Sequence, residues 1–343
     1  MSDQNEVPPA LMLRHLAFVM RASRALYAGA QLGVADILAS GPMTSGEIAA
    51  KTGTDAPTLR RLLRALVAHG VFEEEAPDLF RLNRAGELLR SDTPGSQRAG
   101  VLFTAGDLRW QLWSDFLASV RSGQAVAERV FGKSIFERHM ENAEESALFN
   151  QAMTSFSAAL SAPLIADYDF SSFRRIADIG GGNGRFLADI LAANPKVQGI
   201  LFDLPNVVAG ASPLLEASGV AGRVEVVSGD FLKEVPSGAD AYLLKAVIHD
   251  WDDVRAVAIL RNCRKVMTPN SQLLIVERVM PEKAKQGQAV DAYLLDLEML
   301  VNTPGGRERT AAEFTSILAA TGFGVSRIVP TMTPVSVIEA RPL

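Results

Sequence analysis

From Arg174 onward, short apolar runs alternate with segments of helical periodicity, and this alternation constrains the fold more than any other feature of the chain. The runs expected to form strands cover residues 175–179, 198–202, 224–227, 241–244, 273–276, 324–329 and 335–340. Such alternation predicts βαβ units, which build a parallel sheet covered by helices on both faces. Because only a short break separates the last two runs, we expect them to pair as an antiparallel hairpin at the sheet edge. The predicted class is α/β, with a mostly parallel, Rossmann-like sheet.

The N-terminal part of the chain has a helical texture instead. Apolar residues recur at mostly helical spacing over residues 11–39, and no proline interrupts them, so this stretch is expected to be one helix. Polar residues are sparse between Ala25 and Ala35. Both faces of this helix are therefore expected to be covered, and we expect a homodimer that forms through the N-terminal helices.

A winged helix-turn-helix pattern follows. Thr44 precedes Glu47 by three residues, which predicts a capping box that opens a short helix. A second helix is expected over residues 56–69, and residues 71–75 and 79–82 can pair as a small wing. Arginines on the second helix could face phosphate, or they could form the solvated face of a dimerisation module, which we favour. They are Arg60, Arg61 and Arg64.

Length and composition narrow the class of protein further. The chain has 343 residues, which fits two domains of ordinary size, and its formal net charge is −5. Since affinity for nucleic acid comes largely from basic residues, the acidic balance argues against nucleic acid as a partner. No apolar run reaches the roughly 18 residues that span a bilayer, the N-terminus lacks a secretory signal, and Cys263 is the single cysteine. We expect a cytoplasmic protein that does not bind membranes.

A glycine-rich loop, DIGGGNG, spans residues 178–184 between the first expected strand and a helix that begins near Arg185. Without a Cβ, such a turn lets the backbone approach a nucleotide closely, although it can also be a plain tight turn. The spacing departs from the GxGxxG of dinucleotide enzymes, and Asp178 leads the loop. A carboxylate there suits a cofactor that carries positive charge, such as a sulfonium and an ammonium group.

Acidic residues at the ends of the next two strands support a nucleoside cofactor. The second strand ends at Asp203, in LFDLP, where a carboxylate can accept hydrogen bonds from ribose hydroxyls. The third strand leads into GDF, where Asp230 could accept from an exocyclic amine and Phe231 could cover the adenine. Together these features favour S-adenosylmethionine over a dinucleotide.

The fourth strand leads into LLKAVIHDWDD, which places His249 just past a strand end. Active sites of open α/β sheets lie outside these ends, so His249 is a candidate general base rather than a structural histidine. Glu277 ends the next strand and Glu308 follows a glycine turn, so either could orient the imidazole or could be a surface acid. No His/Cys cluster has the spacing of metal ligands, and methyl transfer from a sulfonium needs no metal, so we expect none.

These motifs together resemble those of the caffeic acid/hydroxyindole type of O-methyltransferases, in a bacterial form. The resemblance covers nearly the whole chain, and its motifs are DIGGGNG, FDLP, GDF, LLKAVIHDWDD, ILRNCRKVM and PGGRERT. It implies three segments: a dimerisation and winged-helix domain over residues 1–100, a helical connector that lines the substrate pocket over residues 101–165, and a class I methyltransferase domain over residues 166–343. It also implies transfer of a methyl group from S-adenosylmethionine to a hydroxyl of a small aromatic molecule.

The resemblance also implies roles for single residues. His249 is expected to be the general base, flanked by Glu277 and Glu308. The expected cofactor contacts are Asp178, Gly180, Asp203, Leu204, Gly229, Asp230, Phe231 and Lys245. The expected substrate contacts are Phe149, Met153, Ala246, Asp250, Met299 and Thr303. Plant members commonly have a tryptophan after the strand-four lysine, whereas this chain has Ala246, so its acceptor pocket is expected to be wider.

Two other hypotheses fit parts of the chain. The winged-helix pattern alone is compatible with a DNA-binding regulator, against which the net charge and the complete base site both argue. A relative that binds the cofactor without transferring methyl is expected to lack the base, whereas His249 and Asp250 are both present. The acceptor itself, and the ring position methylated, stay open.

Overall fold

The computed structural model describes residues 8–343. Residues 1–7 belong to the stretch that was expected to lack a secretory signal, and they lie outside the described residues. The chain divides into two compact units, Met1–Trp110 and Gln111–Leu343. Residues 111–165 group with the C-terminal unit, and the three-segment division stays a prediction. No helix in residues 8–343 is both long and apolar enough to cross a membrane.

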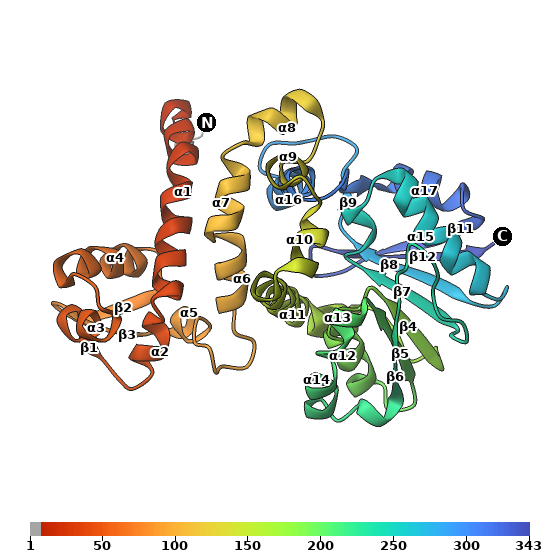
Figure 1. The fold of residues 1–343 in the computed structure, drawn as a ribbon, viewed down its shortest axis with the longest axis horizontal. Coiled ribbons are helices and arrows are strands. Elements are labelled where there is room, and N and C mark those ends of the chain that lie inside the picture. Colours follow the sequence, from red (N-terminus) through yellow and green to blue (C-terminus); the bar gives the residue numbers. More distant parts are fainter. Residues whose placement is uncertain (1–7) are drawn as a thin grey trace, which may run out of the picture. The chain divides into compact units, whose positions relative to one another are not determined.

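The N-terminal unit begins with two helices where one was predicted (Figure 1). Helix α1 covers Pro9–Gln31 and helix α2 covers Val34–Leu38. Gly33 separates them with a φ of +66°, a left-handed conformation that glycine adopts without strain and that ends a helix. The prediction of one continuous helix over residues 11–39 is therefore wrong at Gly33.

The winged-helix pattern forms as expected. Helix α3, Ser45–Thr52, opens with the predicted capping box, in which the Glu47 backbone N–H donates to Thr44 Oγ1 at 3.3 Å. Helix α4, Ala56–Ala68, follows, and the wing is an antiparallel pair. Its strands are β2 (Phe72–Ala76) and β3 (Leu79–Leu82), with the short β1 (Met43–Thr44) added beside β3.

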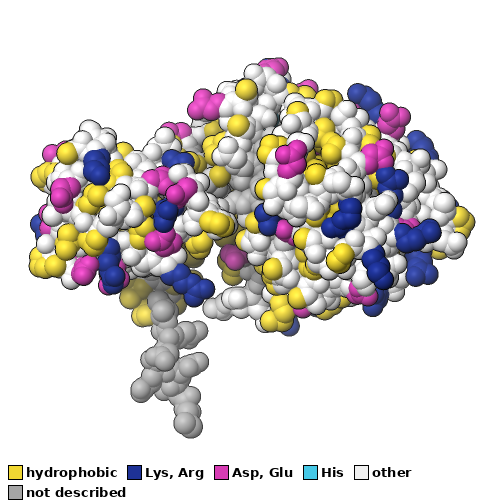
Figure 2. Space-filling model, turned by 90° about the horizontal axis from the view of Figure 1, so that it is seen from below, with side chains coloured by type: hydrophobic (Ala, Val, Ile, Leu, Met, Phe, Trp, Pro, Cys, Tyr) yellow, Lys and Arg dark blue, Asp and Glu magenta, His cyan; other side chains and the backbone are white. Residues whose placement is uncertain are grey.

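The arginines of α4 lie beside acids of the wing. Arg60 Nε is 3.2 Å from Asp78 Oδ1, and Arg64 Nε is 3.5 Å from Glu74 Oε2. On the face drawn in Figure 2, basic and acidic side chains are interspersed, without a continuous basic surface. Exposed pairs of this kind add little stability, but they neutralise the charges that would bind phosphate. This arrangement supports the dimerisation module over the DNA binder.

Short helices lead to the sheet of the C-terminal unit. In chain order they are α5 (Arg84–Glu87), α6 (Arg98–Thr104), α7 (Asp107–Trp113), α8 (Phe116–Ser122), α9 (Val126–Phe131) and α10 (Ile135–Glu141). The long helix α11, Ala143–Asp167, then precedes the first strand of the large sheet and packs against α12 (Arg185–Ala193).

The C-terminal unit contains a seven-stranded sheet of order β11-β12-β8-β7-β4-β5-β6. Its strands are β4 (Arg175–Ile179), β5 (Gln198–Asp203), β6 (Val224–Ser228), β7 (Ala241–Lys245), β8 (Gln272–Glu277), β11 (Phe323–Pro330) and β12 (Ser336–Pro342). Strands β4 to β8 are parallel, and the antiparallel β11–β12 hairpin lies at one edge, with β12 next to β8. The predicted fold class and edge hairpin are confirmed.

Alternating strand residues fill two cores, one on each face of the sheet. Tyr242 and Leu244 contribute to the core beneath α15 (Asp253–Val266) and α17 (Ala311–Ala319). Leu243 contributes to the core beneath α12 and the end of α11. The remaining elements are α13 (Pro205–Val208), α14 (Ser212–Ala217), η1 (Ala221–Arg223), η2 (Ile248–Asp250), β9 (Val279–Met280), α16 (Val290–Asn302) and β10 (Arg309–Thr310). Burial on both faces explains the nearly continuous apolar runs in the sequence.

The strand order reverses at β4, which has β5 on one side and β7 on the other. Ligands of open α/β sheets bind outside the carboxyl ends of the strands at such a switch point. The glycine loop follows β4 and the His249 segment follows β7, so the topology brings both to this point.

Candidate active site

The glycine loop approaches its neighbours too closely for side chains. Gly180 has a φ of +73°, and a Cβ added there would lie 2.8 Å from Val247 Cγ2 and 3.3 Å from the Phe231 ring. Val247 precedes the 3₁₀ turn η2, and Phe231 belongs to the GDF motif. The loop, the turn and the aromatic ring therefore pack directly on one another at the switch point.

Asp203 fixes the glycine loop from the end of β5. Its Oδ2 accepts a hydrogen bond from the Gly182 backbone N–H at 2.8 Å, and its Oδ1 accepts from the Leu204 N–H at 2.7 Å. Burial raises the pKa of this carboxyl, and the two backbone hydrogen bonds oppose the shift. Because a carboxylate has about four acceptor positions, lone pairs remain for ribose hydroxyls.

Asp178 and Lys245 end neighbouring strands and interact electrostatically. Burial raises the pKa of Asp178 to about 7, while Lys245 acts in the opposite direction. Burial lowers the pKa of Lys245 in turn. The Lys245 ammonium donates to Ser157 Oγ of α11 at 2.8 Å, so it is not the snorkelling surface residue that a lysine in a strand can be. A buried carboxyl whose pKa is about 7 is stabilised in its ionised form by a ligand that carries positive charge, so Asp178 favours such a ligand.

The GDF motif closes this side of the site. A Cβ on Gly229 would lie 2.6 Å from the Phe202 ring, so glycine is required there. Asp230 Oδ1 accepts from the Leu232 N–H at 2.9 Å. The Phe231 ring meets the Trp251 ring edge-on, with centroids 5.9 Å apart. A glycine-lined, acidic and aromatic-walled surface of this kind fits a nucleoside that carries a cation.

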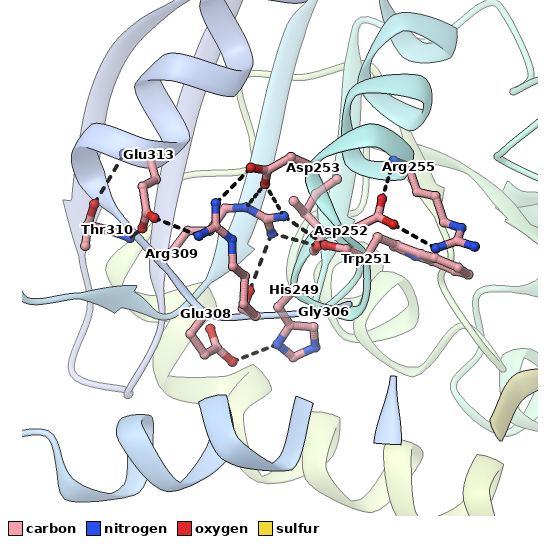
Figure 3. A network of polar contacts seen from close by, with 12 residues as sticks. His249, Trp251, Asp252, Asp253, Arg255, Gly306, Glu308, Arg309, Thr310 and Glu313 are labelled. Atoms are coloured by element: carbon pink, nitrogen blue, oxygen red, sulfur yellow. Dashed lines mark hydrogen bonds and ion pairs between the residues drawn. The ribbon is translucent and has the colours of Figure 1, made fainter. Parts of the chain in front are cut away.

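His249 lies in η2 and is held by a buried carboxylate. Its Nδ1 is 2.8 Å from Glu308 Oε1, and the Glu308 side chain is fully buried (Figure 3). Burial lowers the pKa of the imidazole, but the nearby carboxylates outweigh burial and raise it to about 10. Those carboxylates belong to Asp250, Glu277 and Glu308. With Nδ1 engaged by Glu308, Nε2 is the nitrogen left for another group.

Glu277 supports the same histidine through the backbone rather than through the ring. Its Oε1 accepts hydrogen bonds from three consecutive N–H groups, at 3.1 Å from Val247, 2.6 Å from Ile248 and 3.1 Å from His249. Glu277 and Glu308 were both expected to flank His249. The structure separates them: Glu308 contacts the ring, and Glu277 caps the turn that carries it.

The ligand atoms of His249, Glu277 and Glu308 lie within 4.8 Å of one another, as the atoms of a metal site would. Within this group, His249 Nδ1 and Glu308 Oε1 are hydrogen-bonded to each other, and Glu277 Oε1 accepts from the turn. The second oxygen of each glutamate, Glu277 Oε2 and Glu308 Oε2, is buried without a hydrogen-bond partner among the described residues. The hydrogen bond between the imidazole and a carboxylate is the arrangement of an oriented base.

The expected acceptor contacts come from two helices and the His249 segment. On α11, the Phe149 ring stacks on His139 with centroids 5.0 Å apart, and Met153 follows one turn later. On α16, Met299 is buried. Thr303 directly follows that helix, and its hydroxyl donates to the Met299 carbonyl at 2.8 Å and accepts from the Gly306 N–H at 3.0 Å. That hydroxyl is already used within the protein, so Thr303 can offer an acceptor mainly its methyl group.

Ala246 has an unusual backbone conformation at the end of β7. Its φ is +52°, a region that residues with a Cβ rarely adopt, and its side chain is exposed. Strain of this kind is concentrated at functional sites, because the surrounding structure must hold it. Asp250, four residues later, has its Oδ1 3.7 Å from His249 Nε2.

Three residues that support this site were not singled out from the sequence. Asp296 Oδ1 on α16 accepts from the Glu308 N–H at 2.8 Å. Gly306 allows close approach, since a Cβ there would lie 2.4 Å from the His249 carbonyl oxygen. Arg309 is fully buried. Only the glycine doublet before Arg307 signalled any of them, because side-chain contacts between distant segments leave no periodicity in a sequence.

Two family models match the chain. Residues 113–324 match an O-methyltransferase domain, and residues 14–92 match an O-methyltransferase dimerisation domain. The chain is 40% identical over 337 residues to the phenazine O-methyltransferase PhzM of Lysobacter antibioticus, which covers 98% of this chain and 97% of that protein.

Solved structures are similar to this chain over nearly its whole length. The crystal structure of LaPhzM superposes with a TM-score of 0.93 at 40% identity, and the match covers 98% of this chain and all of that one. The O-methyltransferase NcsB1 from neocarzinostatin biosynthesis was solved with S-adenosylmethionine and 2-hydroxy-5-methyl naphthoic acid. It superposes with a TM-score of 0.80 at 32% identity, covering 99% of this chain and all of that one.

Proposed function

Because this chain belongs to the S-adenosylmethionine-dependent O-methyltransferases, we propose that it methylates a hydroxyl group of a small aromatic molecule, with His249 as the general base. The observation that carries the proposal is the hydrogen bond between His249 Nδ1 and the buried Glu308 carboxylate. It fixes the ring and directs Nε2 to the proton of the acceptor.

S-adenosylmethionine supplies a methyl group that its sulfonium already activates, so the chain's own residues chiefly bind, orient and accept a proton. We infer that the glycine loop with Gly180, together with Asp203, Leu204, Gly229, Asp230 and Phe231, holds the nucleoside. For Asp178 we infer a place beside the charged end, and for Lys245 a contact near the adenine. The raised pKa of Asp178 fits this role, because a cationic ligand would favour its ionised form.

The surrounding carboxylates make His249 a stronger proton acceptor than an ordinary imidazole. They raise its pKa to about 10, and a phenolic hydroxyl also has a pKa of about 10. The raised pKa favours transfer of the hydroxyl proton to the neutral ring at Nε2. Glu308 stabilises the imidazolium that results, which keeps the proton on the protein while the oxygen attacks the methyl carbon.

For the acceptor, we infer an aromatic ring bound between α11 and α16. Phe149 and Met153 would wall one side, and Met299 and Thr303 the other, with Ala246 and Asp250 at the His249 segment. Polarisable Met side chains and aromatic rings suit a flat apolar molecule. NcsB1 binds a naphthoic acid, and PhzM is named for phenazines, which are flat aromatic molecules of this class.

We also infer a homodimer. Residues 14–92 match a dimerisation domain, and α1 exposes large apolar residues on several faces. They include Leu11, Leu13, Leu16, Val19 and Met20, each at least half exposed within this chain. A second copy of α1 would cover them, since a soluble helix rarely leaves so much apolar surface in water.

The test is methyl transfer from labelled S-adenosylmethionine to a panel of hydroxyphenazines and hydroxynaphthoates. We expect turnover of at least one compound, with the label on oxygen. Replacing His249 with Ala should lower kcat roughly 10²–10⁴-fold, the usual share of general acid–base catalysis, while S-adenosylhomocysteine binds as before.

The matched control is His69→Ala, since His69 caps α4 in the other unit. Turnover by His249→Ala at the wild-type rate would remove His249 from the mechanism. Labelling confined to nitrogen or carbon would overturn the acceptor assignment.

A further inference from the structure

Arg309 is buried more completely than any other charged residue in residues 8–343, with none of its side chain exposed. It follows Glu308 directly and lies in β10, which pairs with β9 just beyond Glu277. A guanidinium is stable in such a place only when its donors are paired. Its partners therefore indicate what it is there to hold.

Those partners lie on both sides of His249. Nη1 of Arg309 donates to the Ile248 carbonyl at 3.0 Å. Nη2 donates to the Trp251 carbonyl at 2.8 Å, and Figure 3 shows Arg309 beside Trp251 and Asp253. The planar guanidinium thus grips the turn one residue before the base and two residues after it. Nε and Nη2 also bind Asp253 Oδ1, at 3.2 and 2.8 Å, in the first turn of α15.

The loop that carries Arg309 meets the same turn through its backbone. The Arg307 N–H donates to the His249 carbonyl at 2.8 Å, and Gly305 forms a β-bridge with Trp251. Glu308, between these contacts, reaches the imidazole. The distance between His249 Nδ1 and Glu308 Oε1 therefore depends on how firmly the loop and the turn are joined.

We propose that Arg309 is a positioning residue, which joins the turn of His249 to the loop of Glu308 so that the base and its carboxylate stay in hydrogen-bond register. Arg309 acts through main-chain carbonyls and touches no reacting group. The proposal rests on the proposed function of His249, and it explains why arginine is needed. A lysine has the charge, but its single nitrogen cannot span two carbonyls and a carboxylate in one plane.

The chain provides a matched control in Arg307. Its side chain also pairs with Asp253, at 2.8 Å, and with Glu313, at 3.1 Å, but it is partly exposed. Among the described residues, no hydrogen bond or ion pair joins the Arg307 side chain to the turn. Arg307→Lys therefore tests the loss of an arginine–Asp253 pair. Arg309→Lys also tests the loss of the hydrogen bonds to the Ile248 and Trp251 carbonyls.

The experiment compares full-length Arg309→Lys and Arg307→Lys with the wild type in three measurements. These are kcat and KM on the best acceptor of the panel, the Kd of S-adenosylhomocysteine, and the pKa of His249 from NMR of ¹³C-histidine-labelled protein, with His249→Gln for assignment. For Arg309→Lys we expect kcat to fall on the order of 10²-fold, as a displacement of about 1 Å can cause, with KM and Kd within about twofold. The His249 pKa should fall toward its ordinary range, because Glu308 no longer lies at hydrogen-bond distance.

Arg307→Lys should match the wild type in all three measurements. Adding guanidinium ion to Arg309→Ala should restore part of the kcat and of the His249 pKa. The proposal fails if Arg309→Lys keeps the wild-type kcat and His249 pKa, or if it loses S-adenosylhomocysteine binding in parallel with activity, which would make Arg309 a residue of the fold. If no acceptor is methylated by the wild type, the proposed function fails, and the NMR comparison still decides the role of Arg309.

Discussion

At the scale of single residues, the charge on His249 governs how the site responds to pH. The carboxylates around it raise its pKa to about 10, so the free protein holds an imidazolium at neutral pH. Only the neutral ring can accept a proton. At pH values below the pKa of His249, the neutral fraction increases about tenfold for each unit by which the pH rises. We therefore expect kcat/KM to rise about tenfold per unit between pH 7 and 9, measured with a saturating methyl donor.

Glu308→Gln is the control for this dependence. It removes the negative charge 2.8 Å from Nδ1, so the pKa of His249 should fall and the rise of kcat/KM should move to lower pH. The raised pKa of His249 also affects the free energy of unfolding. The stabilisation from the imidazolium and its carboxylates is fully present below the unfolded pKa of about 6.5, and it is lost as pH rises through the folded pKa of about 10. A flat profile from pH 7 to 9 in the wild type would argue against this protonation state.

The sequence could single out the candidate catalytic residues but not their partners. His249, Glu277 and Glu308 follow strand ends or a glycine turn, which is enough to place them at one edge of the sheet. That Glu277 accepts from three backbone N–H groups, while Glu308 contacts the ring, depends on rotamers and on the path of η2. Neither leaves a pattern in the order of amino acids, and the burial of Arg309 leaves none either.

At the scale of elements, the loop after α16 lies against the His249 turn with no space to spare. A Cβ on Gly306 would lie 2.4 Å from the His249 carbonyl oxygen and 2.2 Å from Thr303 Oγ1. The backbone at His249 cannot move freely away from such a Cβ. We therefore expect Gly306→Ala to lower the free energy of unfolding by about 1–3 kcal/mol, the usual range for overpacking. Because the backbone that is pushed away belongs to His249, the proposed base, kcat should fall as well.

Thermal unfolding and kcat would both be measured for Gly306→Ala. The control is Gly222→Ala in η1, where an added Cβ meets nothing within 4 Å and φ is not positive. That variant should keep both values. Equal behaviour of the two variants would show that the loop can withdraw from His249 without consequence.

Element types were predictable where local chemistry decides them. Each strand of the large sheet was expected within two residues of its observed ends. For the central strands β4, β5, β7 and β8 the reason is burial on both faces, which makes the runs plainly apolar. The helix over residues 11–39 failed at Gly33, where a single glycine ends the periodicity. Strand β1 was missed because two residues, Met43 and Thr44, show no alternation, and only their pairing with β3 defines them.

At the scale of the whole molecule, self-association is the property to measure. Leu16 on α1 is 63% exposed within this chain, and a charge there should prevent burial against a second copy. We expect light scattering after size exclusion to give about twice 36.8 kDa for the wild type and 36.8 kDa for Leu16→Asp. Val254→Asp, at a position 80% exposed on α15, is the control and should stay dimeric. A wild-type monomer would refute the dimer.

The place of β12 in the sheet has a consequence for how the protein is made. It is the last strand of the sheet in chain order, yet it inserts between β11 and β8, and its Ser336 is in register with Glu277. During synthesis, earlier segments leave the ribosome and begin to fold first. Strand β8, which ends in Glu277, therefore cannot pair with β12 until translation has passed residue 342. The catalytic edge can be completed only after that point, so a nascent chain that stalls earlier should emerge folded in its N-terminal unit but without activity.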